Sequence, residues 1–311
     1  MTDSPSKQRI FAVILNRESG TLREQWHEGL PDELVAAFAE GGAIAKVRPA
    51  APPDLDEALD EAIKSKPDAV IIGGGDGTVS NAARKLAGTE MPLGILPFGT
   101  FNLAARDLEL PLDPMEAARV LASAVVRKID MLEVADQACL CTSLIGFYPA
   151  LAKREEEYHG TAWWKKSMRL AQQTFQVWNR TPPLELTIEM EEGTSLRRKT
   201  RFAAFVPGEY DDIFSVIPKR TGLNEGRMTL YLSHHRSLFS LSRGVLAYLL
   251  GQLKVEKDIE RVSTMGVTLG ARRRRELCVM IDGEILNLPL PLDIRVKPAA
   301  LAVLKPQGGE S

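Results

Sequence analysis

The stretch that decides the fold class is the glycine turn, Gly73-Gly74-Gly75-Asp76-Gly77-Thr78. It directly follows the mostly apolar residues 68–72, and the residues after it, 79–87, have a helical pattern. Glycines after a buried strand let the backbone take positive φ and approach a ligand without a Cβ in the way. The N–H groups of such a turn, with those of the helix after it, form an anion site. The stretch therefore predicts a strand–turn–helix unit that can bind phosphate.

The segments around the glycine turn repeat this alternation. Short apolar strands are expected at residues 10–15, 44–47, 68–72 and 93–96. Helices are expected at residues 22–40, 55–64, 79–87 and 114–126. Short, fully apolar strands separated by helices predict a parallel sheet that is covered on both faces. The first domain, residues 1–130, is thus predicted as doubly wound α/β, a class whose ligands bind beyond the carboxyl ends of the strands.

The pattern changes after about residue 130. The second domain, residues 131–311, is predicted to be β-rich and sandwich-like with two helices, and its C-terminal tail can return to the first domain. The helices are expected at residues 151–178 and 238–253. The strands are expected at residues 184–189, 201–206, 228–232, 266–269, 277–282 and 294–296.

Length and composition are those of an ordinary globular protein. The chain has 311 residues, more than one hydrophobic core usually supports, so two domains are expected. Its 39 basic and 41 acidic side chains give a net charge of −2, which excludes a general attraction to nucleic acid or anionic membrane. Three cysteines are too few for a disulfide framework and indicate a reducing compartment. The sequence contains no apolar run of about 18 residues that would span a bilayer.

Asp76 is the most informative residue of the glycine turn. A carboxylate among phosphate-binding N–H groups repels phosphate unless a cation or a hydroxyl substrate lies between them. Asp76 therefore indicates Mg²⁺–nucleotide chemistry or a base near a hydroxyl, unless it is only the N-cap of a tight strand–helix turn. A second turn, the threonine turn (residues 96–102), follows the next strand and carries Thr100 and Asn102. Because neighbouring parallel strands end at one edge of a sheet, the two turns together predict a binding site.

At these residues the sequence resembles the diacylglycerol kinase catalytic-domain family, which includes bacterial lipid kinases and sphingosine kinases. Residues 74–78 match the family's G-G-D-G-T motif, which NAD kinases share. Residues 97–111 match its P-x-G-T-x-N-x-x-A-R-x-L-x-x-P motif. Three further motifs are similar in the same order: N-P-x-S-G at residues 16–20 with Arg17 for the proline, a glycine motif at residues 145–148, and D-G-E at residues 282–284.

The resemblance implies an ATP-binding first domain, a lipid-binding second domain and a cleft between them. Asp282 and Glu284 are implied to be the catalytic pair, with Mg²⁺ at Asp76 and Glu284. The residues implied to bind ATP are Asn16, Ser19, Gly74, Gly75, Asp76, Gly77, Thr78, Gly99, Thr100 and Asn102.

The residues of the D-G-E motif agree with this role. Two residues apart at the end of an expected strand, Asp282 and Glu284 would point to the same side. One carboxylate could take the proton of the lipid hydroxyl while the other holds Mg²⁺, and Asp282 is the expected base. The alternative for D-G-E alone is a hairpin turn.

We therefore expect transfer of the γ-phosphoryl group of ATP to a hydroxyl of a membrane lipid, such as diacylglycerol or a sphingoid base. The protein is expected in the cytoplasm, peripherally at a membrane; nucleic acid is not an expected partner, and the sequence is compatible with a homodimer. Residues 161–180, which are basic and amphipathic, could contact the membrane, although core packing is the favoured explanation for them. The arginines 272–275 could also contact the membrane, and a solvated turn explains them equally well. Two alternatives are a soluble-substrate kinase of the NAD kinase type and a catalytically silent nucleotide- or lipid-binding regulator.

Overall fold

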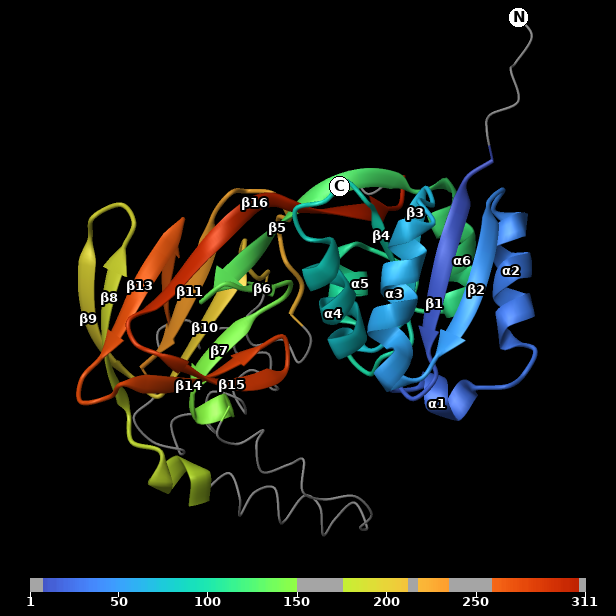
Figure 1. The fold of residues 1–311 in the computed structure, drawn as a ribbon. Helices are drawn as coiled ribbons and strands as arrows, with labels where there is room; N and C mark the ends of the chain where they lie inside the picture. The colour runs from blue at the N-terminus through green and yellow to red at the C-terminus, as the bar shows by residue number, and fades with distance from the viewer. Residues whose placement is uncertain (1–7, 150–175, 212–217, 235–258, 308–311) are drawn as a thin grey trace, which may run out of the picture. The chain divides into compact units, whose positions relative to one another are not determined.

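A computed structural model of the chain describes residues 8–149, 176–211, 218–234 and 259–307 (Figure 1). The chain divides into two compact units, and each contains segments from distant parts of the sequence. Unit 1 comprises Met1–Met131, Ile217–Asn224 and Pro298–Ser311. Unit 2 comprises Leu132–Val216 and Glu225–Lys297.

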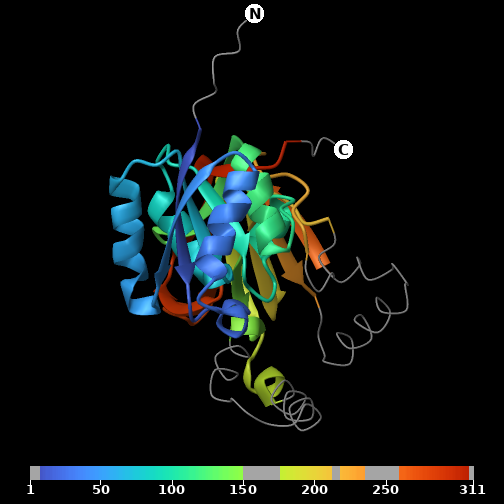
Figure 2. The same cartoon turned by 90° about the vertical axis from the view of Figure 1, so that its right-hand side faces the viewer.

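Unit 1 is built on a parallel sheet with the strand order β2-β1-β3-β4. Its strands are β1 (Ile10–Asn16), β2 (Ile44–Ala50), β3 (Ala69–Gly74) and β4 (Leu93–Pro97). Figure 2 shows helices on both sides of these strands. One side carries α2 (Leu30–Glu40) and α6 (Pro114–Ser123), and the other α3 (Leu55–Lys64) and α4 (Asp76–Leu86). The predicted doubly wound class is thus confirmed for this unit.

The predicted helix over residues 22–40 is two helices. The short helix α1 (Leu22–Gln25) ends at Trp26, whose backbone is extended, and α2 begins at Leu30. Pro31 lies in the first turn of α2. Because proline has no backbone N–H and a fixed φ, it suits the start of a helix and not its interior. A new helix therefore starts at Leu30, with Pro31 in its first turn, instead of one helix continuing through the proline.

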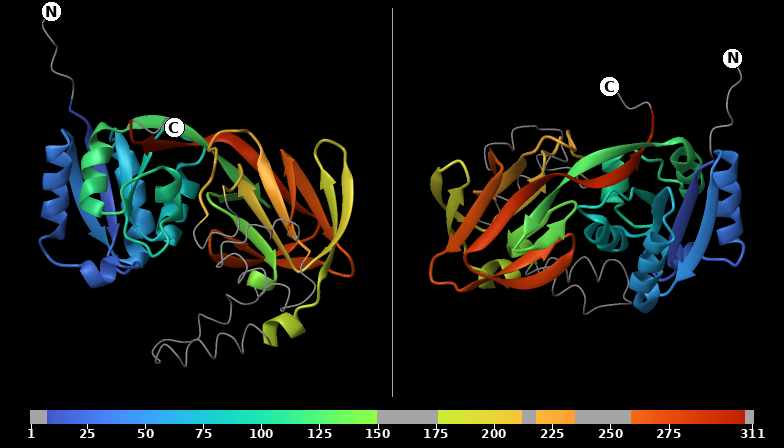
Figure 3. Two further views of the ribbon diagram at one scale, coloured as in Figure 1. Left: turned by 180° about the vertical axis from the view of Figure 1, so that it is seen from behind. Right: turned by 45° about the horizontal axis from the view of Figure 1, so that its top comes forward.

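Two long strands, β5 (Val125–Val134) and β16 (Leu292–Lys305), contribute to both units. They pair with each other and lie side by side in both panels of Figure 3. The sequence predicted only residues 294–296 of β16, and it assigned the start of β5 to the helix that in fact ends at Ser123. In β16, buried and exposed residues alternate over 292–297, whereas 301–304 are all buried. No single period covers the strand, so periodicity alone does not reveal its length.

Unit 2 contains two antiparallel sheets. The first has the order β16-β13-β8-β9, and its further members are β8 (Leu184–Met190), β9 (Ser195–Thr200) and β13 (Gly266–Ala271). The second has the order β12-β11-β10-β7-β14-β15. Its members are β7 (Ser143–Gly146), β10 (Phe202–Pro207), β11 (Met228–Ser233), β12 (Ile259–Thr264), β14 (Glu276–Ile281) and β15 (Glu284–Pro289). The short strand β6 (Gln137–Cys139) pairs with β5.

One hydrophobic core joins the two sheets of unit 2. It contains Leu186 and Leu269 from the first sheet and Phe205 and Val279 from the second, all almost fully buried. This arrangement is the predicted β-rich, sandwich-like domain. The predicted helices over 151–178 and 238–253 lie outside the described residues, apart from residues 176–178, which belong to a helical stretch that continues to residue 180. None of the helices in the described ranges is long and apolar enough to cross a membrane.

Candidate functional site

Three turns of unit 1 end neighbouring strands at the carboxyl edge of its parallel sheet. Residues 16–20, called the asparagine turn below, follow β1; the glycine turn follows β3, and the threonine turn follows β4. In the strand order β2-β1-β3-β4, β2 lies on one side of β1 and β3 lies on the other, so the strand order reverses at β1. Doubly wound sheets bind their ligands at such a switch point.

Asn16 connects the asparagine turn to the glycine turn. Its Nδ2 donates to Oγ1 of Thr78 at 2.9 Å, and the residue is only 8% exposed. Its Oδ1 accepts the N–H of Glu18 at 3.2 Å, and its backbone oxygen accepts the hydroxyl of Ser19 at 3.0 Å. The structure thus brings together three of the predicted residues, Asn16, Ser19 and Thr78.

The asparagine turn also rests on the threonine turn. Thr21 donates both its N–H, at 3.0 Å, and its hydroxyl, at 2.9 Å, to the backbone oxygen of Phe98. Gly20 has φ +42, and a Cβ on it would lie 2.7 Å from the same oxygen. Glycine is therefore needed at this position both for its backbone angle and for the close approach.

The glycines of the glycine turn serve close packing. Gly73, Gly74 and Gly75 all have negative φ, so the expectation of positive φ is wrong for them. A Cβ on Gly74 would lie 2.8 Å from the Cβ of Thr78. A Cβ on Gly99 of the threonine turn would lie 2.8 Å from the Cα of Gly75. The backbones of the two turns are thus in contact, and side chains at these positions would push them apart.

Asp76 joins the glycine turn to the helix that follows the threonine turn, α5 (Leu103–Asp107). Its Oδ2 accepts the N–H of Asn102 at 3.1 Å, and its Oδ1 accepts the N–H of Leu103 at 2.7 Å. A carboxylate is stabilised there because the first N–H groups of a helix lack intrahelical partners and carry partial positive charge. The N-cap of α4 is Gly75, so Asp76 caps α5 and not its own helix.

Asn102 closes the threonine turn. Its backbone is left-handed, with φ +53, a conformation that asparagine tolerates better than most residues. Its Oδ1 accepts the N–H of Gly99 at 2.7 Å, and its Nδ2 donates to the oxygen of Gly99 at 2.8 Å. The side chain of Asn102 therefore shapes the turn, while Thr100 on the same turn is exposed.

A buried ion pair holds the other end of α5. Arg220 donates its Nε to Oδ2 of Asp107 at 2.7 Å and its backbone N–H to Oδ1 at 2.9 Å. The two side chains are 1% and 4% exposed. Beside them, Lys219 donates to Glu109 at 3.0 Å, and this hydrogen bond lowers the pKa of the Glu109 carboxyl. The pair could not be predicted from the sequence, because 113 residues separate its members and no motif marks Arg220.

In unit 2, Asp282 and Gly283 form the two-residue turn between β14 and β15. Their φ values are +47 and +95, as a type I′ hairpin turn requires. The Asp282 carboxylate accepts the N–H groups of Leu140, Cys141 and Thr142, at 2.6, 2.8 and 3.1 Å. Successive N–H groups that converge in this way form an anion nest, which the carboxylate of Asp282 fills. Asp282 therefore fixes the connection between β6 and β7 to the hairpin.

Glu284 occupies a different environment. It is the first residue of β15, pairs with Ile281 across the hairpin and is exposed. The prediction that Asp282 and Glu284 extend from the same side of one strand is wrong. Strand β14 ends at Ile281, one residue earlier than predicted, because the Asp282-Gly283 dipeptide makes the turn.

The predicted Mg²⁺ ligands, Asp76 and Glu284, belong to unit 1 and unit 2 respectively. Within the described part of the chain, no group of three or more histidine, cysteine, aspartate or glutamate side chains could hold a metal ion. A metal ion that needs a cage of protein ligands therefore does not suit these residues, whereas an ion held mainly by a substrate's oxygens does.

The part of unit 1 that contains the three turns matches the model of a known domain family. Residues 11–134 match the model of the diacylglycerol kinase catalytic domain. Residues 11–134 thus form a diacylglycerol kinase catalytic domain by sequence. The match includes the asparagine, glycine and threonine turns, whereas the motifs at residues 145–148 and 282–284 lie outside the matched residues.

Individual relatives extend this similarity over more of the chain. The protein is 27% identical over 262 residues to a diacylglycerol kinase of Mycobacterium tuberculosis, with 82% of each chain covered. It is 32% identical over 128 residues to a diacylglycerol kinase of Staphylococcus haemolyticus, which covers 40% of this chain and 38% of that one. Both of these relatives are named as diacylglycerol kinases.

A solved structure shares the fold of this protein. The crystal structure of a diacylglycerol kinase from Bacillus anthracis superposes with a TM-score of 0.68 at 19% identity. It covers 97% of this chain and 98% of that chain. The similarity therefore includes the β-rich unit 2 as well as the matched catalytic domain.

Proposed function

We propose that the protein is an ATP-dependent lipid kinase, which transfers the γ-phosphoryl group of ATP to a hydroxyl of a membrane lipid such as diacylglycerol or a sphingoid base. The observation that carries the proposal is the meeting of the three turns around Asp76 at the carboxyl edge of the parallel sheet. The match to the diacylglycerol kinase catalytic domain supports a lipid as the acceptor. ATP and membrane lipid meet at the cytoplasmic surface of a membrane, and we place the reaction there.

The glycine turn is the proposed binding site for the ATP phosphates. It leads straight from β3 into α4, a helix of 11 residues, whose first N–H groups suit an anion. A Cβ on Gly77 would meet no atom within 4 Å, so the glycine leaves open space beside the start of this helix. Asn16 and Asn102 hold the neighbouring turns in place through their hydrogen bonds. The binding geometry is therefore built before the nucleotide arrives, which reduces the ordering cost of binding.

Mg²⁺ fits a site with few protein ligands. This ion keeps water and phosphate oxygens as most of its ligands and uses one or two carboxylates of the protein. Asp76 is the carboxylate of the glycine turn, and we propose it as the protein ligand. Bound there, the ion would neutralise the charge that develops on the transferred phosphoryl group.

We propose Glu284 as the group that takes the proton of the lipid hydroxyl, in place of Asp282. The carboxylate of Asp282 accepts three backbone N–H groups, which hold it in one orientation. Glu284, two residues further along, is exposed and can reach a substrate hydroxyl. Asp282 then acts as a positioning residue, because the turn that it anchors presents Glu284.

The proposal is tested by incubating the purified protein with ATP labelled at the γ-phosphate and a panel of acceptors. The panel contains diacylglycerol, a sphingoid base and NAD. After extraction with organic solvent, we expect the labelled phosphate on at least one of the lipids, and we expect no labelled NADP. Label in NADP would identify an NAD kinase. Bound ATP without transfer to any acceptor would identify a catalytically silent regulator.

A matched pair of variants ties the activity to the glycine turn. Asp76→Asn and Asp68→Asn remove the same charge from opposite ends of β3. Asp68 also accepts a backbone N–H, that of Ile10 at 2.7 Å, but it precedes β3 at the amino edge of the sheet. We expect Asp76→Asn to lose transfer and Asp68→Asn to retain it. Equal loss in both variants would show that stability, and not the site, was changed.

A further inference from the structure

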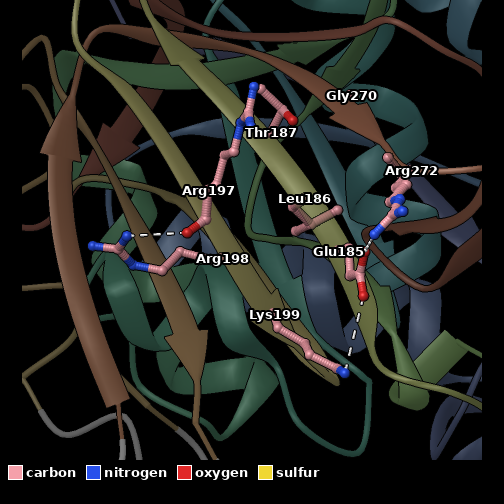
Figure 4. A pocket seen from close by; sticks show the side chains of 9 residues that line it. Glu185, Leu186, Thr187, Arg197, Arg198, Lys199, Gly270 and Arg272 are labelled. Carbon is pink, nitrogen blue, oxygen red and sulfur yellow. Dashed lines mark hydrogen bonds and ion pairs between the residues drawn. The ribbon is translucent and has the colours of Figure 1, made fainter.

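A hollow of about 670 Å³ lies on the first sheet of unit 2 (Figure 4). It is lined by residues 185–187 of β8, 197–199 of β9 and 270–272 at the end of β13. Along β8, the core-facing residues Leu186 and Ile188 alternate with Glu185 and Glu189, which are exposed. The outward positions of these strands therefore form a polar face whose side chains are free of core packing.

Side-chain size creates the hollow. Across the three strands, Arg197 pairs with Thr187, and Thr187 pairs with Gly270. The threonine is short and the glycine has no side chain, so the middle of this face is low. Beside this row, Glu185 pairs with Lys199, and its backbone oxygen accepts the N–H of Arg272 at 3.0 Å. Long cationic side chains thus stand around a low centre.

The charges around the hollow are unbalanced. Glu185 is the only carboxylate among its lining residues, and it is shared by Arg272 at 3.1 Å and Lys199 at 4.0 Å. Arg198 is paired elsewhere, with both carboxylate oxygens of Glu260. In the described residues Arg197 has no ion-pair partner. The hollow therefore carries more positive than negative charge.

The connection from β13 to β14 extends this charge. Arg273, Arg274 and Arg275 follow Arg272 directly and are exposed, and within the described ranges they make no ion pair. We call Arg197, Lys199 and residues 272–275 the basic surface. Together with the neighbouring exposed carboxylates Glu185, Glu189 and Glu276, its six cations give a net charge of +3, in a chain whose total is −2. The basic surface is thus a local concentration of charge.

We infer that the basic surface docks unit 2 on an anionic phospholipid bilayer, with headgroup phosphates at the hollow. Arginines recognise phosphate oxygens through several donors at once, and juxtamembrane basic residues attract anionic lipid. The choice of a membrane rests on the proposed lipid kinase function, because the substrate would lie in a bilayer. Nucleic acid suits the surface less well, since no aromatic side chain lines the hollow or follows in residues 273–275 to stack on bases.

The inference is tested by sedimentation of the full chain with vesicles of phosphatidylcholine, with and without phosphatidylglycerol. The test variant is Arg197→Gln/Arg274→Gln, which leaves the ion pairs of Glu185 intact. The matched control is Lys64→Gln/Arg127→Gln, which removes the same charge from exposed positions of unit 1. We expect the native protein to bind only the anionic vesicles. Each arginine of the basic surface should contribute about fivefold in partitioning, so the test variant should bind about 25-fold more weakly.

Equal loss of vesicle binding in the test and control variants would overturn the inference, and so would equal binding of the native protein to both kinds of vesicle. A third contrary result is that single-stranded oligonucleotide displaces the protein from anionic vesicles at a lower concentration than added phosphatidylglycerol does. A separate readout is phosphorylation of a short-chain diacylglycerol dispersed in water. The test variant should keep the native kcat on it, since the basic surface is not part of the catalytic machinery. If no acceptor is phosphorylated while anionic vesicles are bound, the proposed kinase function fails and the docking surface stands.

Discussion

Asp282→Asn and Glu284→Gln make the same chemical change two residues apart, and we expect opposite consequences. Asp282→Asn should lower the free energy of unfolding, whereas Glu284→Gln should leave stability unchanged and remove activity. The turn itself should survive in both variants, because Asn-Gly forms type I′ turns as readily as Asp-Gly. Any loss of stability in Asp282→Asn therefore reports the contacts of the carboxylate.

The magnitude follows from those contacts. Oδ1 of Asp282 accepts two N–H groups, from Cys141 and Thr142, and Oδ2 accepts that of Leu140. In asparagine, the amide nitrogen replaces one oxygen and cannot accept, so one N–H loses its partner, which costs about 1–3 kcal/mol. The remaining two bonds change from charged to neutral, which weakens each by about 1 kcal/mol. We expect a total of about 3–5 kcal/mol.

Glu284→Gln should behave differently because Glu284 is exposed. Surface substitutions usually change stability by less than about 0.5 kcal/mol. Loss of a general base typically lowers the rate by about 10²–10⁴. Urea denaturation followed by far-ultraviolet circular dichroism measures the first quantity, and kcat with labelled ATP and lipid measures the second.

The roles given to Asp282 and Glu284 are wrong if Asp282→Asn loses activity and Glu284→Gln loses stability. A fully stable Asp282→Asn that has lost kcat by a factor of about 100 or more would make Asp282 the base. A Glu284→Gln with native kcat would leave Glu284 without the proposed role.

Three further predictions concern packing and charge. Gly99→Ala should raise the KM for ATP, because the added Cβ would lie 2.8 Å from the Cα of Gly75 and push the two turns apart. The far-ultraviolet circular dichroism spectrum should change little, and an unchanged KM would contradict this. Arg220→Met should lower the free energy of unfolding by about 3–5 kcal/mol, because it leaves the charge of Asp107 buried without a partner. In urea denaturation, Arg220→Met/Asp107→Leu should be more stable than the single variant; a less stable double variant would contradict this. The hydrogen bond from Arg198 lowers the pKa of Glu260. The pair therefore stabilises the fold above the pKa that this carboxyl has in the unfolded chain, and the stabilisation is lost as pH falls below about 5 and through the lowered folded pKa. Arg198→Met should make the free energy of unfolding fall less steeply with pH in this acid range.

The buried parallel strands of unit 1 were predictable because each is a short, continuous apolar run. β3, for example, is buried at all six positions, and the sequence placed it within two residues. The amphipathic helix α3 has the predicted bounds, Leu55–Lys64. In both elements, one local pattern carries the whole signal.

The polar strands of unit 2 were not predictable in this way. β9 has the sequence Ser-Leu-Arg-Arg-Lys-Thr and lies at the end of its sheet, where charged residues are common. Its membership in the sheet depends on pairing with β8, and a local window does not contain that partner. The same holds for β15, whose place is set by the Asp282-Gly283 turn.

Motif spacing located the candidate site but not the functions of its side chains. The glycine and threonine turns were expected side by side, and the structure places Gly75 against Gly99. That Asp76 caps α5 and that Asp282 fills a nest of N–H groups depends on contacts between segments 26 to about 140 residues apart. Such contacts leave no periodic signal, so residue type alone suggested free carboxylates where the structure has hydrogen-bonded ones.

The central claim is that the asparagine, glycine and threonine turns hold the phosphates of ATP. Amide hydrogen exchange with and without a non-hydrolysable ATP analogue and Mg²⁺ tests it directly. We predict slower exchange in residues 16–20, 73–78 and 96–102 when the analogue is present, and no such change in Asp76→Asn. Protection confined to other segments, with unchanged exchange in all three turns, would contradict the claim.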